Sequence, residues 1–154
     1  LENVKSDFEL LIDQKRARIN SDKLPTILGN KLQFHQLFSN LIGNSLKFSD
    51  EVPLIQITYR RAPAGDNLHP NLDLNAEYHV LNFKDNGIGF DQAFEEQIFG
   101  LFHRLHNRKD YSGTGIGLAM CKKIVENHHG LIKATSAKGQ GATFTVFFPY
   151  EYNE

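Results

Sequence analysis

A chain of 154 residues, 40% hydrophobic and 23% charged, has the size and composition of one globular domain with one core. Its formal net charge of -1 gives no support for binding to nucleic acid or to a membrane surface. The single Cys121 excludes an internal disulfide framework, and no apolar run resembles a membrane span or a signal peptide. We therefore expect a cytoplasmic domain. Because the chain begins at Leu1, we expect a fragment of a longer protein, which can itself be membrane-anchored.

The first 22 residues carry apolar side chains at roughly helical spacing among many charges. This pattern predicts a single amphipathic helix that ends near Asn20 to Asp22, and we interpret residues 1–22 as a helical lead-in from an upstream domain. The following stretch, residues 24–28, contains Pro25 and predicts a short edge strand.

The stretch from Gly29 to Phe48 predicts the central helix of the domain, with Asn30 as its N-cap. Amide side chains lie along the edge of its apolar face, where an ordinary amphipathic helix would not place them. Such a placement favours a ligand, whereas isolated asparagines more often bind nearby backbone, so the helix alone leaves both interpretations open. The polar stripe consists of Gln33, Gln36, Asn40, Asn44 and Lys47.

Two strands are predicted next, over Leu54–Arg60 and Glu77–Lys84, with a long polar loop between them. The second strand places Asp85 on the same side as Leu81 and Phe83. A carboxylate that continues an apolar row needs a partner, because burying an unpaired charge is very costly.

A glycine-containing segment, DNGIGF, follows from Asp85 to Phe90. Gly87 and Gly89 allow the backbone to approach another group closely or to adopt a positive φ, although the segment alone is typical of a turn.

The next part of the chain predicts one or two short helices over residues 92–102 and a basic polar loop over residues 103–112. The sequence GTGIGL, residues 113–118, then opens a helix predicted over Ala119–His129, with Gly130 as its C-cap. Glycines that open a helix leave backbone N–H groups and the positive end of the helix dipole available to an anion.

Three other kinds of site are disfavoured by local sequence. A Rossmann site needs GxGxxG after a strand, whereas GTGIG has the spacing GxGxG and follows a polar loop. A P-loop needs a GK[ST] element, which is absent from the sequence. Zinc has poor support, because no cysteine accompanies the four histidines His103, His106, His128 and His129.

Four features stand in one order along the chain: an asparagine helix, DNGIGF, a phenylalanine-rich segment with basic residues, and GTGIGL. This ordered set resembles the N, G1, F and G2 boxes of the catalytic ATP-binding domain of sensor histidine kinases, in the GHKL ATPase superfamily. The resemblance runs from about Leu24 to Pro149 and includes the closing GQGATFTVFFP, which is similar to the last hairpin of the family.

The resemblance implies an α/β two-layer sandwich, with a mixed sheet of about five strands and the helices packed on one face. Two final strands, predicted over residues 131–135 and 142–148, would complete this sheet. Residues 1–22 would lead in from a dimerisation and phosphoacceptor domain, and residues 23–154 would form the catalytic domain.

The resemblance also implies a function in two-component signalling. The domain would bind ATP and Mg²⁺ and donate the γ-phosphoryl group to a histidine of the dimerisation domain of the same kinase. A response regulator would be an indirect partner, and we expect neither nucleic-acid binding nor direct membrane contact from this domain.

Carried over residue by residue, the resemblance assigns the base-binding side of the site to the G1 box and the end of the long helix. Asp85 would accept a hydrogen bond from the amino group of adenine. Gly87 and Gly89 would let the loop pass close to the base. Ile88 and Phe48 would pack against the faces of the base.

The phosphate side of the site would come from the asparagine helix, the lid and the G2 box. Asn44 would be the Mg²⁺ ligand, and Asn40 and Lys47 would reach phosphate oxygens. Arg104, in a lid over residues 100–112, would meet the γ-phosphate, so the candidate catalytic residues are Asn40, Lys47 and Arg104. The G2 box, which would hold the phosphate chain, consists of Gly113, Thr114, Gly115, Ile116, Gly117 and Leu118.

Asn40 bears on the reaction, because hydrolysing relatives carry a glutamate at this position as general base and an amide cannot act as a base. We therefore expect slow hydrolysis and a γ-phosphate that is kept for transfer. Two alternatives stay open: a nucleotide-binding regulatory module without transfer, and a GHKL serine kinase or ATPase. A structural domain without a nucleotide is the most remote alternative.

Overall fold

The computed structural model describes residues 1–101 and 115–151. No helix in these two ranges has both the length and the apolar character that crossing a bilayer requires. In chain order the elements are α1 (Glu2–Asp7), α2 (Glu9–Lys15), β1 (Arg18–Ser21), α3 (Lys31–Lys47), β2 (Leu54–Ala62), β3 (Tyr78–Asp85), the 3-10 helix η1 (Gln92–Phe94), α4 (Glu95–Ile98), α5 (Gly117–Asn127), β4 (Leu131–Ser136) and β5 (Ala142–Pro149).

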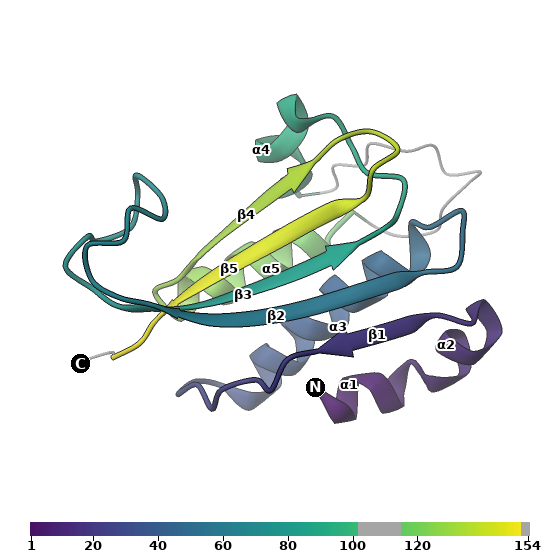
Figure 1. Ribbon diagram of the computed structural model, residues 1–154, viewed down its shortest axis with the longest axis horizontal. Helices are drawn as coiled ribbons and strands as arrows, with labels where there is room; N and C mark the ends of the chain where they lie inside the picture. Colours follow the sequence, from purple (N-terminus) through teal and green to yellow (C-terminus); the bar gives the residue numbers. More distant parts are fainter. Residues whose placement is uncertain (102–114, 152–154) are drawn as a thin grey trace.

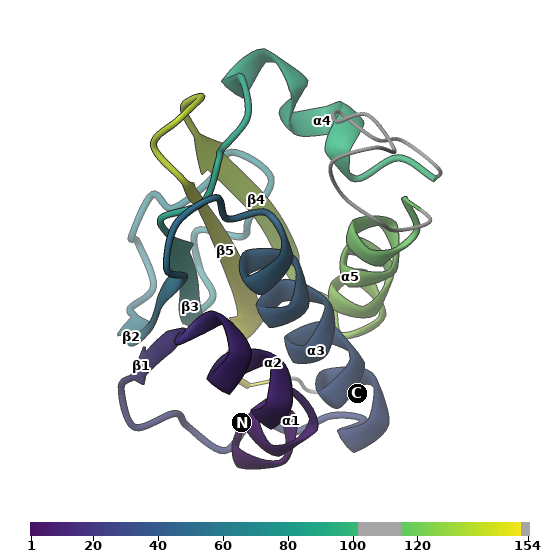
Figure 2. The ribbon, with the colours of Figure 1, turned by 90° about the vertical axis from the view of Figure 1, so that its right-hand side faces the viewer.

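The strands form a five-stranded mixed sheet in the order β1-β2-β3-β5-β4 (Figure 1). β1 pairs with β2 in parallel, and the β2–β3, β3–β5 and β5–β4 pairs are antiparallel. The long helices α3 and α5 lie side by side on one face of this sheet (Figure 2). The predicted two-layer α/β sandwich with a mixed sheet is therefore confirmed.

The main hydrophobic core lies between the helices and the sheet. The strands contribute residues at every second position, because alternate side chains of a strand point to the same face. α3 contributes residues that are three or four positions apart, as expected for the buried face of a helix. Fully buried members of this core include Leu37, Leu41, Ile42 and Leu46 from α3 and Ile57, Leu81, Phe83 and Val146 from the sheet.

A second, smaller cluster lies on the opposite face of the sheet. It contains the buried side chains of Tyr78, Val80 and Phe147, and the loop between β2 and β3 packs Leu68 and Leu72 against them. This loop runs beyond the end of the sheet (Figure 1). The apolar side chains of the loop therefore cover a part of the sheet that the helices leave open.

The N-terminal region differs from the predicted single helix. The helix is interrupted at Phe8 and ends at Lys15, where Arg16 adopts a left-handed conformation with φ of 53°. Arg18–Ser21 forms β1, the edge strand, and residues 24–28 have no regular secondary structure. The charged, loosely periodic sequence is compatible with a helix, but pairing with β2 decides the conformation of β1. The wider assignment of residues 1–22 to a lead-in segment stays a prediction.

The start of α3 is fixed as predicted, by the Asn30 cap. The side-chain Oδ1 of Asn30 accepts a hydrogen bond from the backbone N–H of Gln33 at 3.0 Å. The backbone N–H of Asn30 in turn donates to Nε2 of His128 at 3.0 Å, and Nδ1 of the same ring lies 2.8 Å from the carbonyl oxygen of Ile124. His128 therefore joins the N-cap of α3 to the last turn of α5.

The end of α5 corrects a detail of the sequence analysis. The helix ends at Asn127, and the left-handed residue is His129, with φ of 57°, rather than Gly130. A Cβ atom at Gly130 would lie only 2.2 Å from the carbonyl oxygen of Phe147. Glycine is needed at this position because β5 passes so close, and not because of a positive φ.

Candidate functional site

Asp85 ends β3 with a half-buried carboxylate that the protein itself supplies with hydrogen bonds. Its Oδ1 accepts from the backbone N–H groups of Gly87, at 2.8 Å, and Ala142, at 3.1 Å. Its Oδ2 lies 3.0 Å from the hydroxyl of Ser45 on α3. The need for a partner was predictable from the sequence, but these three partners were not.

The protonation of Asp85 reflects two opposing effects. Burial raises the pKa of its carboxyl above the ordinary value, because a charged group loses hydration inside the protein. The hydrogen bonds from Gly87, Ser45 and Ala142 act in the opposite direction, because they stabilise the ionised form. The pKa of Asp85 remains raised, as is common for carboxylates in ligand sites.

The loop after Asp85 is held against α3 and β5 at distances that only glycine permits. A Cβ atom at Gly87 would lie 2.5 Å from the carbonyl oxygen of Phe48, and one at Gly141 would lie 2.0 Å from that of Asp85. Gly89 has a φ of 64°, in the left-handed region. The backbone N–H of Ile88 donates to the carbonyl oxygen of Phe48 at 2.9 Å, so this loop closes directly on the end of α3.

Asn86 has a structural task that the sequence motif did not reveal. Its side-chain oxygen accepts from the backbone N–H of Leu54 at 2.8 Å, and its amide donates to the carbonyl oxygen of Val52 at 3.0 Å. These two bonds fix the start of β2 beside the loop. Asn86 therefore joins the segment that follows Asp85 to the start of β2.

Asn40 lies where α3 meets the beginning of α5. Its side-chain amide donates to the carbonyl oxygen of Gly117 at 3.1 Å, and its oxygen accepts from Gln36 at 2.9 Å. A Cβ atom at Gly117 would meet Asn40 at an ordinary distance of 3.8 Å. The structure therefore brings the asparagine stripe and the second glycine box together.

The other predicted residues of α3 follow at helical intervals. Asn44 lies one turn after Asn40 and one turn before Phe48, and both Asn44 and Lys47 are half-buried. The ammonium of Lys47 is 5.2 Å from the centre of the Phe48 ring. The part of the polar stripe from Asn40 to Lys47 thus extends from the start of α5 to the loop that follows Asp85.

The G2 box is described only in part. Gly115 has a φ of 73°, Ile116 precedes α5, and Gly117 and Leu118 form the first turn of that helix. Gly113, Thr114 and Arg104, together with residues 102–112 of the predicted lid, lie outside the described residues. The described half of the box therefore presents the N-terminus of α5 beside Asn40, as an anion site would require.

Two residues that the sequence analysis did not single out anchor the segment before the predicted lid. Gln92 accepts from the backbone N–H of Ser136 at 2.8 Å and donates to the carbonyl oxygen of Ala134 at 3.0 Å. Glu95 accepts from the backbone N–H of Ala134 at 3.0 Å. These side chains provide hydrogen-bond partners for backbone groups on the outer edge of β4, which has no neighbouring strand on that side. They also fix η1 and α4 against the sheet.

The half-buried Asn44 offers an amide oxygen, which is compatible with a Mg²⁺ ion that is bound mainly through a nucleotide. Amide oxygens suit this hard cation, which retains waters and phosphate oxygens as further ligands. In residues 1–101 and 115–151 no group of three or more His, Cys, Asp or Glu residues could hold a metal ion by itself. Asn44 is therefore suited to be the single protein ligand of such an ion, and the described residues do not form a complete metal cage.

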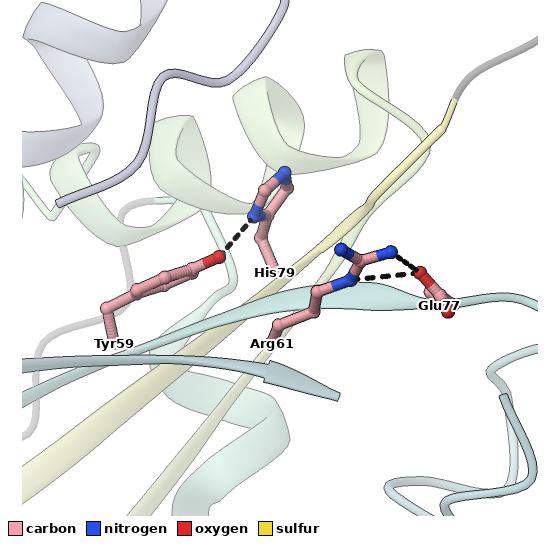
Figure 3. A network of polar contacts seen from close by, with 4 residues as sticks. All are labelled: Tyr59, Arg61, Glu77 and His79. Carbon is pink, nitrogen blue, oxygen red and sulfur yellow. Dashed lines mark hydrogen bonds and ion pairs between the residues drawn. The ribbon is translucent and has the colours of Figure 1, made fainter. Parts of the chain in front are cut away.

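A cleft of about 450 Å³ lies away from the predicted site, between residues 26–29, the end of α5 and the end of β5. Its wall includes His79, whose Nδ1 is 3.0 Å from the hydroxyl of Tyr59 (Figure 3). Burial and the nearby Arg61 lower the pKa of His79. The guanidinium of Arg61 donates to Glu77 (Figure 3). Its central carbon also lies 3.5 Å from the centre of the Tyr150 ring.

This cleft is at the opposite end of the paired helices from the predicted site. Asn30, before α3, contacts His128, after α5, whereas Asn40 contacts the first residue of α5. The two helices therefore run in opposite directions. The structure separates the histidines of the cleft from every described residue of the predicted site.

Comparison with known proteins identifies the family in agreement with this geometry. Residues 29–152 match the family described as histidine kinase-, DNA gyrase B-, and HSP90-like ATPase. The chain belongs to this ATPase family, whose members contain an ATP-binding domain of this kind. Within the family, its resemblance to the catalytic domain of two-component sensor histidine kinases is confirmed by its relatives.

Among the relatives, cyanobacterial phytochrome A of Nostoc sp. is 44% identical over 139 residues, which are 90% of this chain and 16% of that protein. The sensor histidine kinase WalK of Bacillus subtilis is 34% identical over 120 residues, which are 75% of this chain and 18% of that protein. The chain therefore spans about a sixth of the length of these relatives.

Solved structures show the same fold. The mycobacterial sensor histidine kinase MprB superposes with a TM-score of 0.74 at 18% identity, over 96% of this chain and 92% of that chain. The catalytic domain of the histidine kinase ThkA, in a nucleotide-free form, gives a TM-score of 0.72 at 22% identity, over 96% of this chain and 88% of that chain.

Proposed function

We propose that this domain binds Mg²⁺ and ATP and donates the γ-phosphoryl group to a histidine on a separate helical domain of the same sensor kinase. The observation that carries the proposal is the half-buried carboxylate of Asp85, which accepts hydrogen bonds from Ser45 and two backbone N–H groups. The loop beside it contains glycines that allow its backbone to lie close to the end of α3. A carboxylate in this setting suits recognition of a hydrogen-bond donor on a ligand. The adenine amino group is such a donor.

The base is proposed to lie between the G1 loop and the end of α3. Asp85 accepts from the amino group of adenine, and Gly87 and Gly89 keep the loop free of side chains that would block the base. Ile88 and Phe48, which are joined through the backbone bond between them, supply apolar contacts to the ring.

The triphosphate is proposed to follow the polar stripe of α3 toward the N-terminus of α5. Asn40 and Lys47 bind phosphate oxygens, Asn44 binds Mg²⁺, and the N–H groups of residues 115–118 face the phosphate chain. Gly113 and Thr114 complete the G2 box. The ion, when bound, neutralises charge that develops on the phosphates. Arg104 of the lid meets the γ-phosphate and stabilises its charge during transfer.

Asn40 supports transfer rather than hydrolysis. An amide cannot take a proton from water, and the Asn40 amide is already engaged with Gly117 and Gln36. The neutral imidazole of an acceptor histidine brings its own lone pair and needs no base to activate it. The proposed partners are therefore the histidine-containing dimerisation domain of the parent kinase and, through it, a response regulator, all in the cytoplasm.

The test is phosphorylation in trans. The domain is incubated with γ-labelled ATP, Mg²⁺ and the phosphoacceptor segment of the parent kinase, and label that is acid-labile but stable to base is measured. We expect such label with the wild type and with Asn71→Ala, an exposed loop control, and none with Asn44→Ala. Binding of ATP without transfer would favour the regulatory module, and label that is stable to acid would favour a serine kinase. Absence of ATP binding would refute the proposal.

A further inference from the structure

Ser45 faces Asp85 from the buried side of α3. The residue is 4% exposed, and its Oγ lies 3.0 Å from Oδ2 of Asp85 and 3.1 Å from the carbonyl oxygen of Leu41. A hydroxyl has one proton and can donate it to only one of these acceptors. The Leu41 carbonyl already accepts the helical N–H of Ser45, and an ionised carboxylate is the stronger acceptor. The proton of Ser45 therefore goes to Asp85 when that group is charged.

The remaining capacity of Asp85 is small. An ionised carboxylate has about four lone-pair positions. Oδ1 accepts from Gly87 and Ala142, and Oδ2 accepts from Ser45. One position on Oδ2 is left for a ligand, and it accepts an N–H group but repels a ligand oxygen that carries lone pairs itself.

We propose that Ser45 is a positioning residue that orients the carboxylate of Asp85 and keeps it ionised, so that the site selects a purine with a 6-amino group over one with a 6-keto group. This inference rests on the proposed function, because it needs a nucleotide base at Asp85. Without the Ser45 hydroxyl, Oδ2 has no partner on α3. A protonated Asp85 would then donate to a keto oxygen, and the distinction between the two purines would weaken.

The groups that surround Asp85 explain why Ser45 can affect the protonation of its carboxylate. The carboxylate is contacted from α3 by Ser45, from its own loop by Gly87 and from β5 by Ala142, and all three are uncharged donors. Burial raises the pKa of Asp85, and no charged side chain among the described residues opposes this effect. The Ser45 hydroxyl is the one side-chain donor, among the described residues, that lowers the pKa.

The experiment measures binding of ATP and of inosine triphosphate, each with Mg²⁺, by titration calorimetry between pH 5 and 8. The variants are Ser45→Ala, Ser45→Thr, which keeps the hydroxyl, and Ser39→Ala, a control on the same helix. Circular dichroism establishes that each variant is folded. Because the nucleotides also titrate, the variants are compared with the wild type at each pH.

We expect Ser45→Ala to bind ATP about tenfold more weakly at neutral pH, since a hydrogen bond to a charged group is lost. We also expect its preference for ATP over inosine triphosphate to fall by about as much, and the pH below which ATP binding is lost to move upward by about one unit. Ser39→Ala and a folded Ser45→Thr should behave like the wild type.

The inference is overturned if Ser45→Ala keeps the wild-type preference and pH profile. It is also overturned if the affinities for both nucleotides fall equally with no change in the pH profile, because that result indicates a purely structural role. If Ser45→Thr does not fold, the comparison of Ser45→Ala with Ser39→Ala still decides the question. Failure of the wild type to bind ATP would instead refute the proposed function.

Discussion

Replacing Asp85 by asparagine separates the stability of the domain from its ability to bind a nucleotide. The side-chain oxygen of an amide can still accept from the N–H groups of Gly87 and Ala142. Its NH₂ group can donate to the Ser45 hydroxyl, which then donates its own proton to Leu41. All three internal bonds of Asp85 can therefore be kept, but the amide offers a donor where the ligand needs an acceptor.

The expected loss of binding is large and the expected change of stability is small or favourable. A hydrogen bond to a charged group contributes about 1.5–3 kcal/mol, which corresponds to roughly 10- to 150-fold in affinity for ATP. Because burial raises the pKa of Asp85, the folded state binds this proton more tightly than the unfolded state does. The free energy of unfolding of the wild type therefore falls as the pH rises from the unfolded pKa to the folded pKa. The Asp85→Asn variant does not lose stability in this way, because its amide does not titrate.

The assay combines calorimetric titration with ATP and thermal unfolding between pH 4 and pH 8, with Asp13→Asn on the exposed face of α2 as the control. We expect Asp85→Asn to melt at or above the wild-type temperature at neutral pH, while its affinity for ATP falls roughly 10- to 150-fold. Wild-type affinity in this variant would refute the role of Asp85 in binding the base. A strongly lowered melting temperature at neutral pH would refute the account of its hydrogen bonds.

Three further predictions concern the frame of the site. Gly141→Ala should lower the free energy of unfolding by roughly 1–3 kcal/mol or more in chemical denaturation, because the residue has a φ of 74° and its Cβ would lie 2.0 Å from the carbonyl oxygen of Asp85; wild-type stability would contradict this. Gln92→Ala should lower the free energy of unfolding by about 0.5–1.5 kcal/mol and increase hydrogen exchange at the Ser136 amide, which loses its acceptor; unchanged protection would show that the contact is unimportant. The thiol of Cys121 is fully buried, and burial raises its pKa to about 12, so it should react with a thiol reagent at pH 8 only after unfolding; rapid labelling of the native domain would disprove its burial.

The features that could be predicted from the sequence are those that depend on local pattern. The long helix and its Asn30 cap follow from side-chain type and helical spacing. The placement of Asp85 at the end of an apolar row follows from the alternation of β3. The order of the four boxes along the chain was enough to indicate the family, although each box alone is a weak signal.

The features that could not be predicted depend on contacts between distant parts of the chain. Ser45 and Asp85 are 40 positions apart, and Gln92 and Ala134 are 42 apart. β1 is a strand because β2 lies beside it, although its own sequence of four residues continues a helical pattern. None of these pairings leaves a periodic signal in either partner alone.

The pairing of α3 with α5 has a consequence for the thermodynamics of ligand binding. Asn30 and His128 fasten the helices at one end, and Asn40 and Gly117 fasten them ten residues further along α3. The amides of α3 and the N-terminus of α5 therefore keep a fixed separation before any ligand arrives. A triphosphate that bridges the two helices as proposed would not bear the entropic cost of bringing them together, so more of its interaction energy would remain as affinity.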